Sequence, residues 1–172
     1  MNLRENPLLT KRDKELILQQ CENQGATSAE QIAGFAIAYA DAKWFCAELR
    51  NRGESMPEIE TVDGLCNLVR RKVMEWAAMI EPRNSRGFRK IPVVFANGNS
   101  GLHPDLIERA MDNFFDSETA PSYPNEVYLE FERIHPFEDG NGRLGHLLWA
   151  MTAYAVTNEW PETLPPEPDW TK

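Results

Sequence analysis

The spacing of apolar residues predicts helices over most of the first 80 residues. Apolar positions recur at helical intervals over 11–23, and a glycine follows that segment. Thr27-Ser28-Ala29-Glu30 has the form of a capping box, so a second helix is expected from there to about residue 50. We expect residues 1–80 to form the N-terminal helical part of a single domain. A third helix is predicted over 61–80, from apolar residues three and four positions apart: Val62, Leu65, Leu68, Val69, Val73, Trp76 and Ala77.

The segment from 82 to 103 has a different texture and predicts a small β-hairpin. Ile91-Pro92-Val93-Val94-Phe95 is a short run of β-forming residues, and asparagines and glycines over 97–101 supply a turn. Because Pro92 has no N–H to donate, its strand is expected at an edge. The fold class is therefore mainly α with one hairpin, and helices are predicted again over 104–115 and 123–134.

The strongest chemical signal is the segment His135-Pro136-Phe137-Glu138-Asp139-Gly140-Asn141-Gly142-Arg143, which is followed by an apolar stretch. A loop that turns into a helix here leaves several backbone N–H groups unpaired near one point. Such a helix N-terminus binds anions, and glycine lets a phosphate approach the backbone closely. Arg143 adds a permanently charged fork, and Asn141 adds an uncharged donor. The segment therefore predicts a phosphate-binding site.

Two more side chains of this segment predict chemistry at the phosphate. His135 has an ordinary pKa close to neutrality, so it can accept the proton of an attacking hydroxyl. Asp139 would repel a bare phosphate but is well suited to hold Mg²⁺ against one. A base, a metal carboxylate and an anion site together indicate in-line displacement at phosphorus, and hence a nucleotide substrate.

Structural interpretations compete with this one. Asp-Gly-Asn-Gly could be an ordinary turn before a helix, and a lone histidine is more often hydrogen-bonded within the fold. An EF-hand calcium loop fails on register, because Asp139 as first ligand puts Arg143 fifth and Ala150 twelfth. The joint occurrence of these residues, in a chain with 3 histidines, favours the phosphate site.

Composition narrows the setting. The 172 residues suit one domain, and a net charge of −9 argues against a nucleic-acid-binding surface. Three cysteines without C-x-x-C spacing fit reduced thiols rather than a disulfide framework or a zinc site. No apolar run is long enough to span a membrane, so a cytoplasmic protein is expected, with delivery into another cell left open. Residues 161–172 are acidic and rich in proline, and are expected to form an extended tail.

His135 to Arg143 matches, letter for letter, the core signature H-P-F-x-D/E-G-N-G-R of the Fic family. The chain resembles that family over about 85–157, because Arg86-Gly87-Phe88-Arg89, the hairpin and His103-Pro104 are similar to its flap region. The resemblance implies a helical core over 81–160, with a flap at about 86–103 and a catalytic motif at 135–146. Most members transfer AMP from ATP to a protein hydroxyl. The resemblance therefore implies a Mg²⁺-dependent nucleotidyltransferase that uses ATP to modify (AMPylate) a Ser, Thr or Tyr of a target protein.

Roles for individual residues follow from the resemblance. His135 would deprotonate the target hydroxyl, Phe137 would anchor the loop, and Asp139 would hold Mg²⁺ across the α- and β-phosphates. Arg143 would bind the outer phosphates, and the anion hole would be formed by Gly140, Asn141 and Gly142. The flap would pair with an extended segment of the target through Lys90, Ile91, Val93, Val94 and Phe95.

The chain departs from the family at His146, where the signature has a second arginine that grips the γ-phosphate. A histidine is shorter and mostly uncharged at neutral pH. The same scaffold could therefore act as a phosphotransferase or use a donor other than ATP. It could also be a nucleotide-binding regulator without transfer, or a catalytically weakened module that binds a partner protein.

Many family members are restrained by a helix with the pattern S/T-x-x-x-E-G/N. Glu22-Asn23 has the right ending, but Leu18 stands where the pattern requires a hydroxyl, so Glu22 is expected to be a solvated helix residue. A separate inhibitory protein, as in toxin–antitoxin pairs, is the alternative source of restraint.

Overall fold

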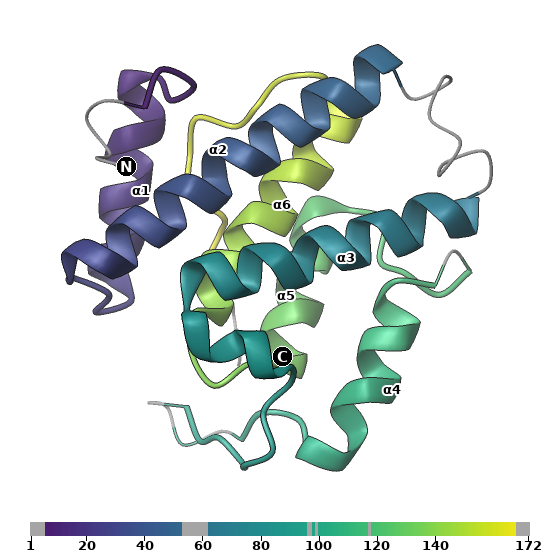
Figure 1. The fold of residues 1–172 in the computed structure, drawn as a ribbon. Helices are drawn as coiled ribbons and strands as arrows, with labels where there is room; N and C mark the ends of the chain where they lie inside the picture. The colour runs from purple at the N-terminus through teal and green to yellow at the C-terminus, as the bar shows by residue number, and fades with distance from the viewer. Residues whose placement is uncertain (1–5, 53–61, 96–97, 99, 117, 168–172) are drawn as a thin grey trace.

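Helices account for nearly all regular structure in the computed structural model, which describes residues 6–52, 62–95, 98, 100–116 and 118–167 (Figure 1). The prediction of a mainly α fold is confirmed. Six α-helices and one 3-10 helix are found in these residues: α1 (Lys11–Asn23), α2 (Ala29–Arg52), α3 (Val62–Ile80), η4 (Pro82–Arg86), α4 (Pro104–Phe114), α5 (Pro124–Ile134) and α6 (Asn141–Thr157).

The central element is α6, which packs against α5, α2 and α3. In Figure 1, α2 and α3 cross in front of it. Every residue from Asn141 to Ala150 is buried, including the polar residues at its N-terminus. A helix that is buried on all sides must be apolar around most of its circumference, as the sequence after Arg143 is. The fold therefore places the start of α6, and with it the second half of the predicted motif, inside the protein.

The start of α2 differs from the prediction by one residue. The capping box is formed by Ser28 and Gln31 rather than by Thr27 and Glu30. The backbone N–H of Gln31 donates to Ser28 Oγ at 3.2 Å, and the backbone N–H of Ser28 donates to Gln31 Oε1 at 3.4 Å. Both pairs have the spacing of the motif, and glutamine replaces glutamate as acceptor at the third helical position.

A close approach of α2 and α3 fixes the position of the end of α3. A Cβ placed on Gly34 would lie 2.2 Å from the main-chain oxygen of Met79, so only glycine allows the two backbones to meet there. Elsewhere between the same two helices, Phe45 of α2 and Trp76 of α3 pack in a T-shaped arrangement, with ring centroids 5.8 Å apart. The last residue of α3, Ile80, reaches the predicted site through its carbonyl and its side chain.

The predicted β-hairpin flap is wrong for the residues that the structure describes. Those between η4 and α4 contain no strand, and their pairing is limited to one antiparallel bridge between Val94 and Ser100. Two causes are visible. Pro92 cannot donate to a ladder, and the carbonyls of Ile91 and Leu102 are taken by the guanidinium of Arg89. Asn97 and Asn99, which belong to the predicted turn, lie outside the described residues.

The segment after α6 returns across the N-terminal helices. Trp160 donates from Nε1 to the hydroxyl of Tyr39 at 2.8 Å, and the guanidinium of Arg12 donates to the carbonyl of Glu162. Residues 161–167 have no regular secondary structure, as predicted for the tail; 168–172 lie outside the described residues. All three cysteines are free. None of the helices described is both long and apolar enough to cross a membrane.

Candidate active site

The site begins where α5 ends, at His135. This residue has a left-handed backbone (φ 48°, ψ 61°), and its N–H donates to the carbonyl of Phe131 at 2.9 Å. A left-handed conformation is uncommon outside glycine, and at a functional side chain it is a form of stored strain. Burial, followed by the positive charge of Arg89, lowers the pKa of His135 to about 4. The imidazole is therefore neutral at pH 7 and can accept a proton.

The loop from His135 to α6 is closed by the side chain of Asn141. Its Oδ1 accepts the N–H of Phe137 at 2.9 Å, and its Nδ2 donates to the carbonyl of Phe137 at 2.8 Å. Phe137 is fully buried and packs against Phe88, so it anchors the loop as the resemblance implied. The amide of Asn141 is thus committed to the loop, and what this residue offers an anion is its backbone N–H.

Arg89 joins the loop to the chain before it. Its side chain is 2% exposed and donates to the carbonyls of His135, Ile91 and Leu102, and more weakly to that of Ile134. Its backbone N–H also donates to the carbonyl of Pro136 at 2.9 Å. A guanidinium has donors in a rigid fork, so this one side chain holds three segments in fixed relation.

The N-terminus of α6 has the geometry of an anion site. Gly140 is left-handed (φ 80°), and a Cβ there would lie 2.7 Å from Ile80, so glycine is required for both reasons. The backbone N–H groups of the first residues, Asn141 to Arg143, have no partner inside the helix. The dipole of α6 adds a partial positive charge at this point.

The end of α1 covers this helix N-terminus. Gln20 donates from Nε2 to the carbonyl of Gly142 at 3.1 Å, and a Cβ on Gly142 would lie 1.6 Å from Nε2 of Gln24. Gln24 therefore rests directly on the glycine that an incoming phosphate would approach. Gln24 is an exposed residue at the end of its helix, so its side chain can swing aside without disturbing the core. Glu22 is exposed on the same helix, as predicted.

Asp139 lies between two arginines. Its Oδ1 accepts from the backbone N–H of Gly140 at 2.6 Å and from Arg143 at 3.3 Å, and its Oδ2 lies 3.6 Å from Arg83. The carboxylate is 41% exposed, whereas the Arg143 side chain is only 1% exposed. Mg²⁺ usually takes one or two carboxylates together with substrate phosphates and water. One half-exposed carboxylate beside an anion site fits a metal that arrives with a nucleotide.

His146 lies apart from these residues, although the sequence grouped it with them. It is 0% exposed and packs among the rings of Tyr39, Phe35 and Trp149, with centroids 5.7, 5.9 and 6.1 Å away. Neither ring nitrogen has a hydrogen-bond partner among the described residues, and burial lowers the pKa of His146 to about 3. In this conformation His146 is a neutral core residue that no phosphate can reach.

The residues of the predicted flap fall into a half-buried group and an exposed group. Phe95 packs against the His135 ring in a T-shaped arrangement at 4.8 Å between centroids, which brings the segment 90–95 onto the site. Val93 is half-buried, and its carbonyl accepts the N–H of Gly101 at 3.1 Å. The other members of the set are exposed: Lys90, Ile91 and Val94.

Sequence reasoning missed four contributors. Arg89 was noted only as part of a segment, and nothing in the sequence marks it as buried. Gln24 and Arg83 reach the site through tertiary packing that no spacing reveals. Glu132 could have been found, because it lies one helical turn before His135 on a predicted helix.

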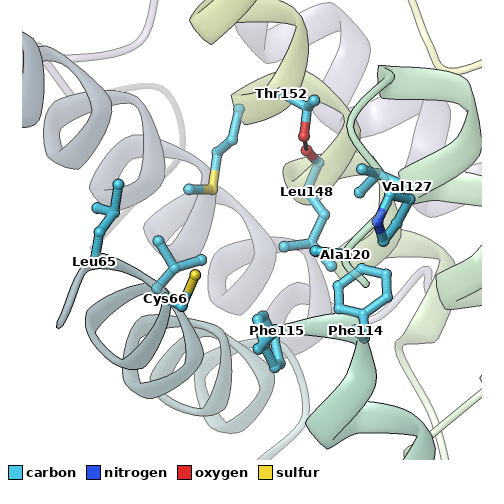
Figure 2. Close-up of a pocket in the computed structure, with 11 residues that line it drawn as sticks. Leu65, Cys66, Phe114, Phe115, Ala120, Val127, Leu148 and Thr152 are labelled. Carbon is cyan, nitrogen blue, oxygen red and sulfur yellow. Dashed lines mark hydrogen bonds between the residues drawn. The ribbon is translucent and has the colours of Figure 1, made fainter. Parts of the chain in front are cut away.

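A cavity of about 220 Å³ lies elsewhere, between α3, α4, α5 and α6 (Figure 2). Its lining is almost entirely apolar. The hydroxyl of Thr152 is already bound to the carbonyl of Leu148 on its own helix, as the dashed line in Figure 2 shows. The cavity shares no residue with the segment from His135 to Arg143 and offers no group for phosphate chemistry.

Replacement of Arg89 by Met should lower the free energy of unfolding by about 2 kcal/mol or more, since buried carbonyls lose their donors. Urea denaturation measures this. Arg86→Met, an exposed change three residues earlier, is the matched control and should change stability by less than about 0.5 kcal/mol. Equal effects of the two substitutions would contradict the role given to Arg89.

His146→Phe should stabilise the protein more at pH 5 than at pH 8. With a folded pKa of about 3 and an unfolded pKa of about 6.5, the unfolded chain binds the extra proton between these values. The wild type therefore loses stability as pH falls from about 6.5. The variant does not, because phenylalanine has no proton to gain.

The gain from His146→Phe should grow by about 2 kcal/mol between pH 8 and pH 5 in denaturation experiments. His103→Asn is the control, since asparagine can also cap α4 and position 103 is exposed. A gain that is the same at both pH values would mean that His146 is not held neutral by burial.

Comparison with known proteins is consistent with this geometry. No curated protein matches the chain. The sequence profile described as the Fic/DOC family matches residues 63–153, a range that contains all but the first residue of α3, the segment around Arg89, the loop after His135 and most of α6. The match covers more than half of the chain, and the chain belongs to the Fic/DOC family.

Proposed function

We propose that this protein transfers AMP, or a related nucleotide, from a Mg²⁺-bound nucleoside triphosphate to a Ser, Thr or Tyr hydroxyl of a target protein. The observation that carries the proposal is geometric: a histidine whose side chain is only 20% exposed lies five residues before Gly140, the glycine N-cap of α6. Membership of the Fic/DOC family supports nucleotidyl transfer as the reaction class.

In the proposed reaction the hydroxyl oxygen of the target attacks the α-phosphorus. The bond from that phosphorus to the oxygen bridging the α- and β-phosphates breaks, and pyrophosphate leaves. The hydroxyl proton passes to His135. Because Nδ1 of His135 is buried, Nε2 is the nitrogen left to take it.

The start of α6 would hold the phosphates once Gln24 moves aside. The backbone N–H groups of Asn141, Gly142 and Arg143 would donate to phosphate oxygens, and the Arg143 guanidinium would add charge nearby. Asp139 would hold Mg²⁺, which supplies charge neutralisation between the phosphates.

The segment 90–95, although it forms no hairpin, would hold the target. Ile91 and Val94 are 57% and 69% exposed, large fractions for apolar side chains, and both lie close in sequence to Phe95 on the His135 ring. The Ile91 carbonyl is occupied by Arg89, so any pairing with an extended target segment would use the remaining main-chain groups around Val94.

A second candidate is transfer from a donor other than ATP, or transfer of the γ-phosphoryl group. The burial of His146 favours a donor other than ATP, because the position that would grip a γ-phosphate offers no cation and no access.

Label transfer in a cell lysate tests both candidates. The protein is incubated with Mg²⁺ and ATP labelled at the α- or the γ-phosphate, with His135→Ala beside the wild type and His103→Asn as the matched control. AMP transfer predicts label from α-ATP only, lost by at least about 100-fold in His135→Ala and retained in the control.

Label from γ-ATP alone would replace the first candidate with phosphoryl transfer. Label from neither, repeated with other labelled nucleoside triphosphates, would contradict transfer and favour a module that only binds a partner protein.

A further inference from the structure

Glu132 lies on α5 three residues before His135, the C-cap of that helix, with its carboxylate facing the imidazole. The distance between Glu132 Oε2 and His135 Nδ1 is 3.8 Å, and the two side chains are 10% and 20% exposed. This separation is too long for a hydrogen bond. A modest rotation of the Glu132 side chain would close it, because Glu132 lies in the last turn of α5 and His135 follows directly as the C-cap of that helix.

The pair consists of groups that lack other partners. His135 Nδ1 and Glu132 Oε1 are both buried, and neither makes a hydrogen bond within 3.5 Å among the described residues; the acceptor that raises the pKa of His135 from nearby is the main-chain carbonyl of Glu132. A buried polar atom without a partner costs about 1–3 kcal/mol, so a hydrogen bond between the two side chains is favoured. No other carboxylate is recorded within 4.0 Å of the His135 ring in the part of the chain that is described.

The surroundings leave room for this carboxylate. Gly145 on α6 faces it, and a Cβ there would lie 3.0 Å from Glu132 Oε1 and 3.1 Å from the ring of Tyr128. The other charged or titratable groups around the pair are Arg89, which lowers the pKa of His135, Asp139, which raises it, and Tyr128. Burial raises the pKa of Glu132 to about 7, so its charge changes close to neutral pH.

We propose that Glu132 is a positioning residue that keeps the proton of neutral His135 on Nδ1 and so leaves Nε2 free to act as the base. This inference rests on the function proposed above. Each nitrogen of a neutral imidazole is either donor or acceptor, and the group bonded to one nitrogen decides the role of the other.

The step balances with one proton. Nε2 takes the proton of the attacking hydroxyl, and the ring becomes an imidazolium with N–H on both nitrogens. The Glu132 carboxylate accepts the hydrogen bond from Nδ1–H and stabilises that positive charge without taking the proton. When Glu132 is itself protonated it becomes a donor to Nδ1, which moves the ring proton to Nε2 and blocks the base.

The Glu132→Gln variant tests the inference, because glutamine keeps the size of the side chain and removes the titrating charge. The first measurement is ¹⁵N NMR of the His135 ring in the free protein between pH 6 and pH 8. In the wild type the Nδ1–H form should increase as pH rises through about 7. In Glu132→Gln the ratio of the two tautomers should not change over this range.

The second measurement is the pH profile of label transfer. The wild-type rate should rise through about pH 7, and the Glu132→Gln rate should be flat from pH 6 to 8 and about 10-fold lower at pH 8, with KM unchanged. Glu130→Gln is the matched control, since Glu130 is a half-buried residue of α5 paired with Arg133 away from His135, and it should behave as wild type in both measurements.

Tautomer ratios that follow the same pH course in wild type and Glu132→Gln would overturn the inference, whatever the transfer rate. The proposed function fails on a different result, namely label transfer that survives His135→Ala.

Discussion

The buried guanidinium of Arg89 is the interaction on which the rest of the site depends. It donates to carbonyls at the end of α5, on the flap and just before α4, and these three segments share little other regular pairing in the described residues. Main-chain dipoles stabilise its charge, and desolvation lowers its pKa from the usual value for arginine. After burial, the same charge helps to lower the pKa of His135, so one side chain affects both the shape of the site and the protonation of its histidine.

The second constraint is that α6 is both the core of the fold and the floor of the site. Its burial from Asn141 to Ala150 holds the donors at its N-terminus in place, which is the pre-organisation that charge stabilisation requires. The same burial removes His146 from any role at the surface. It also brings α1 against the first turn, where Gln24 occupies the approach to Gly142. The packing that stabilises the N-terminus of α6 therefore also restricts the access of a ligand to it.

The sequence was sufficient for features that depend on local pattern. The helices follow from apolar spacing. Glycines before an apolar helix also led to an anion site between His135 and Arg143, which stays a prediction. The capping box of α2 was misplaced by one residue, because Thr27 and Ser28 are adjacent hydroxyls with acceptors three residues on. Local pattern cannot choose between two such pairs.

What the sequence could not predict was decided by tertiary packing. The run of β-forming residues at 91–95 predicted a strand, but Arg89 takes the Ile91 carbonyl that a ladder would need. His146 has the spacing of a phosphate ligand, yet its direction is set by rings from α2 and by Trp149. Gln24 contacts Gly142, which is more than 100 residues away in the sequence, and neither spacing nor composition predicts that contact.

The central claim is that the first turn of α6 binds the phosphates of a nucleotide. The most direct measurement is a titration of the ¹⁵N-labelled protein with Mg²⁺-ATP, followed through the backbone amide signals of Asn141, Gly142 and Arg143. We expect these three amides to show the largest saturable shifts, and the side-chain amide of Gln24 to shift with them as it is displaced. Saturable binding that leaves these amides unmoved would place the nucleotide elsewhere and contradict the account.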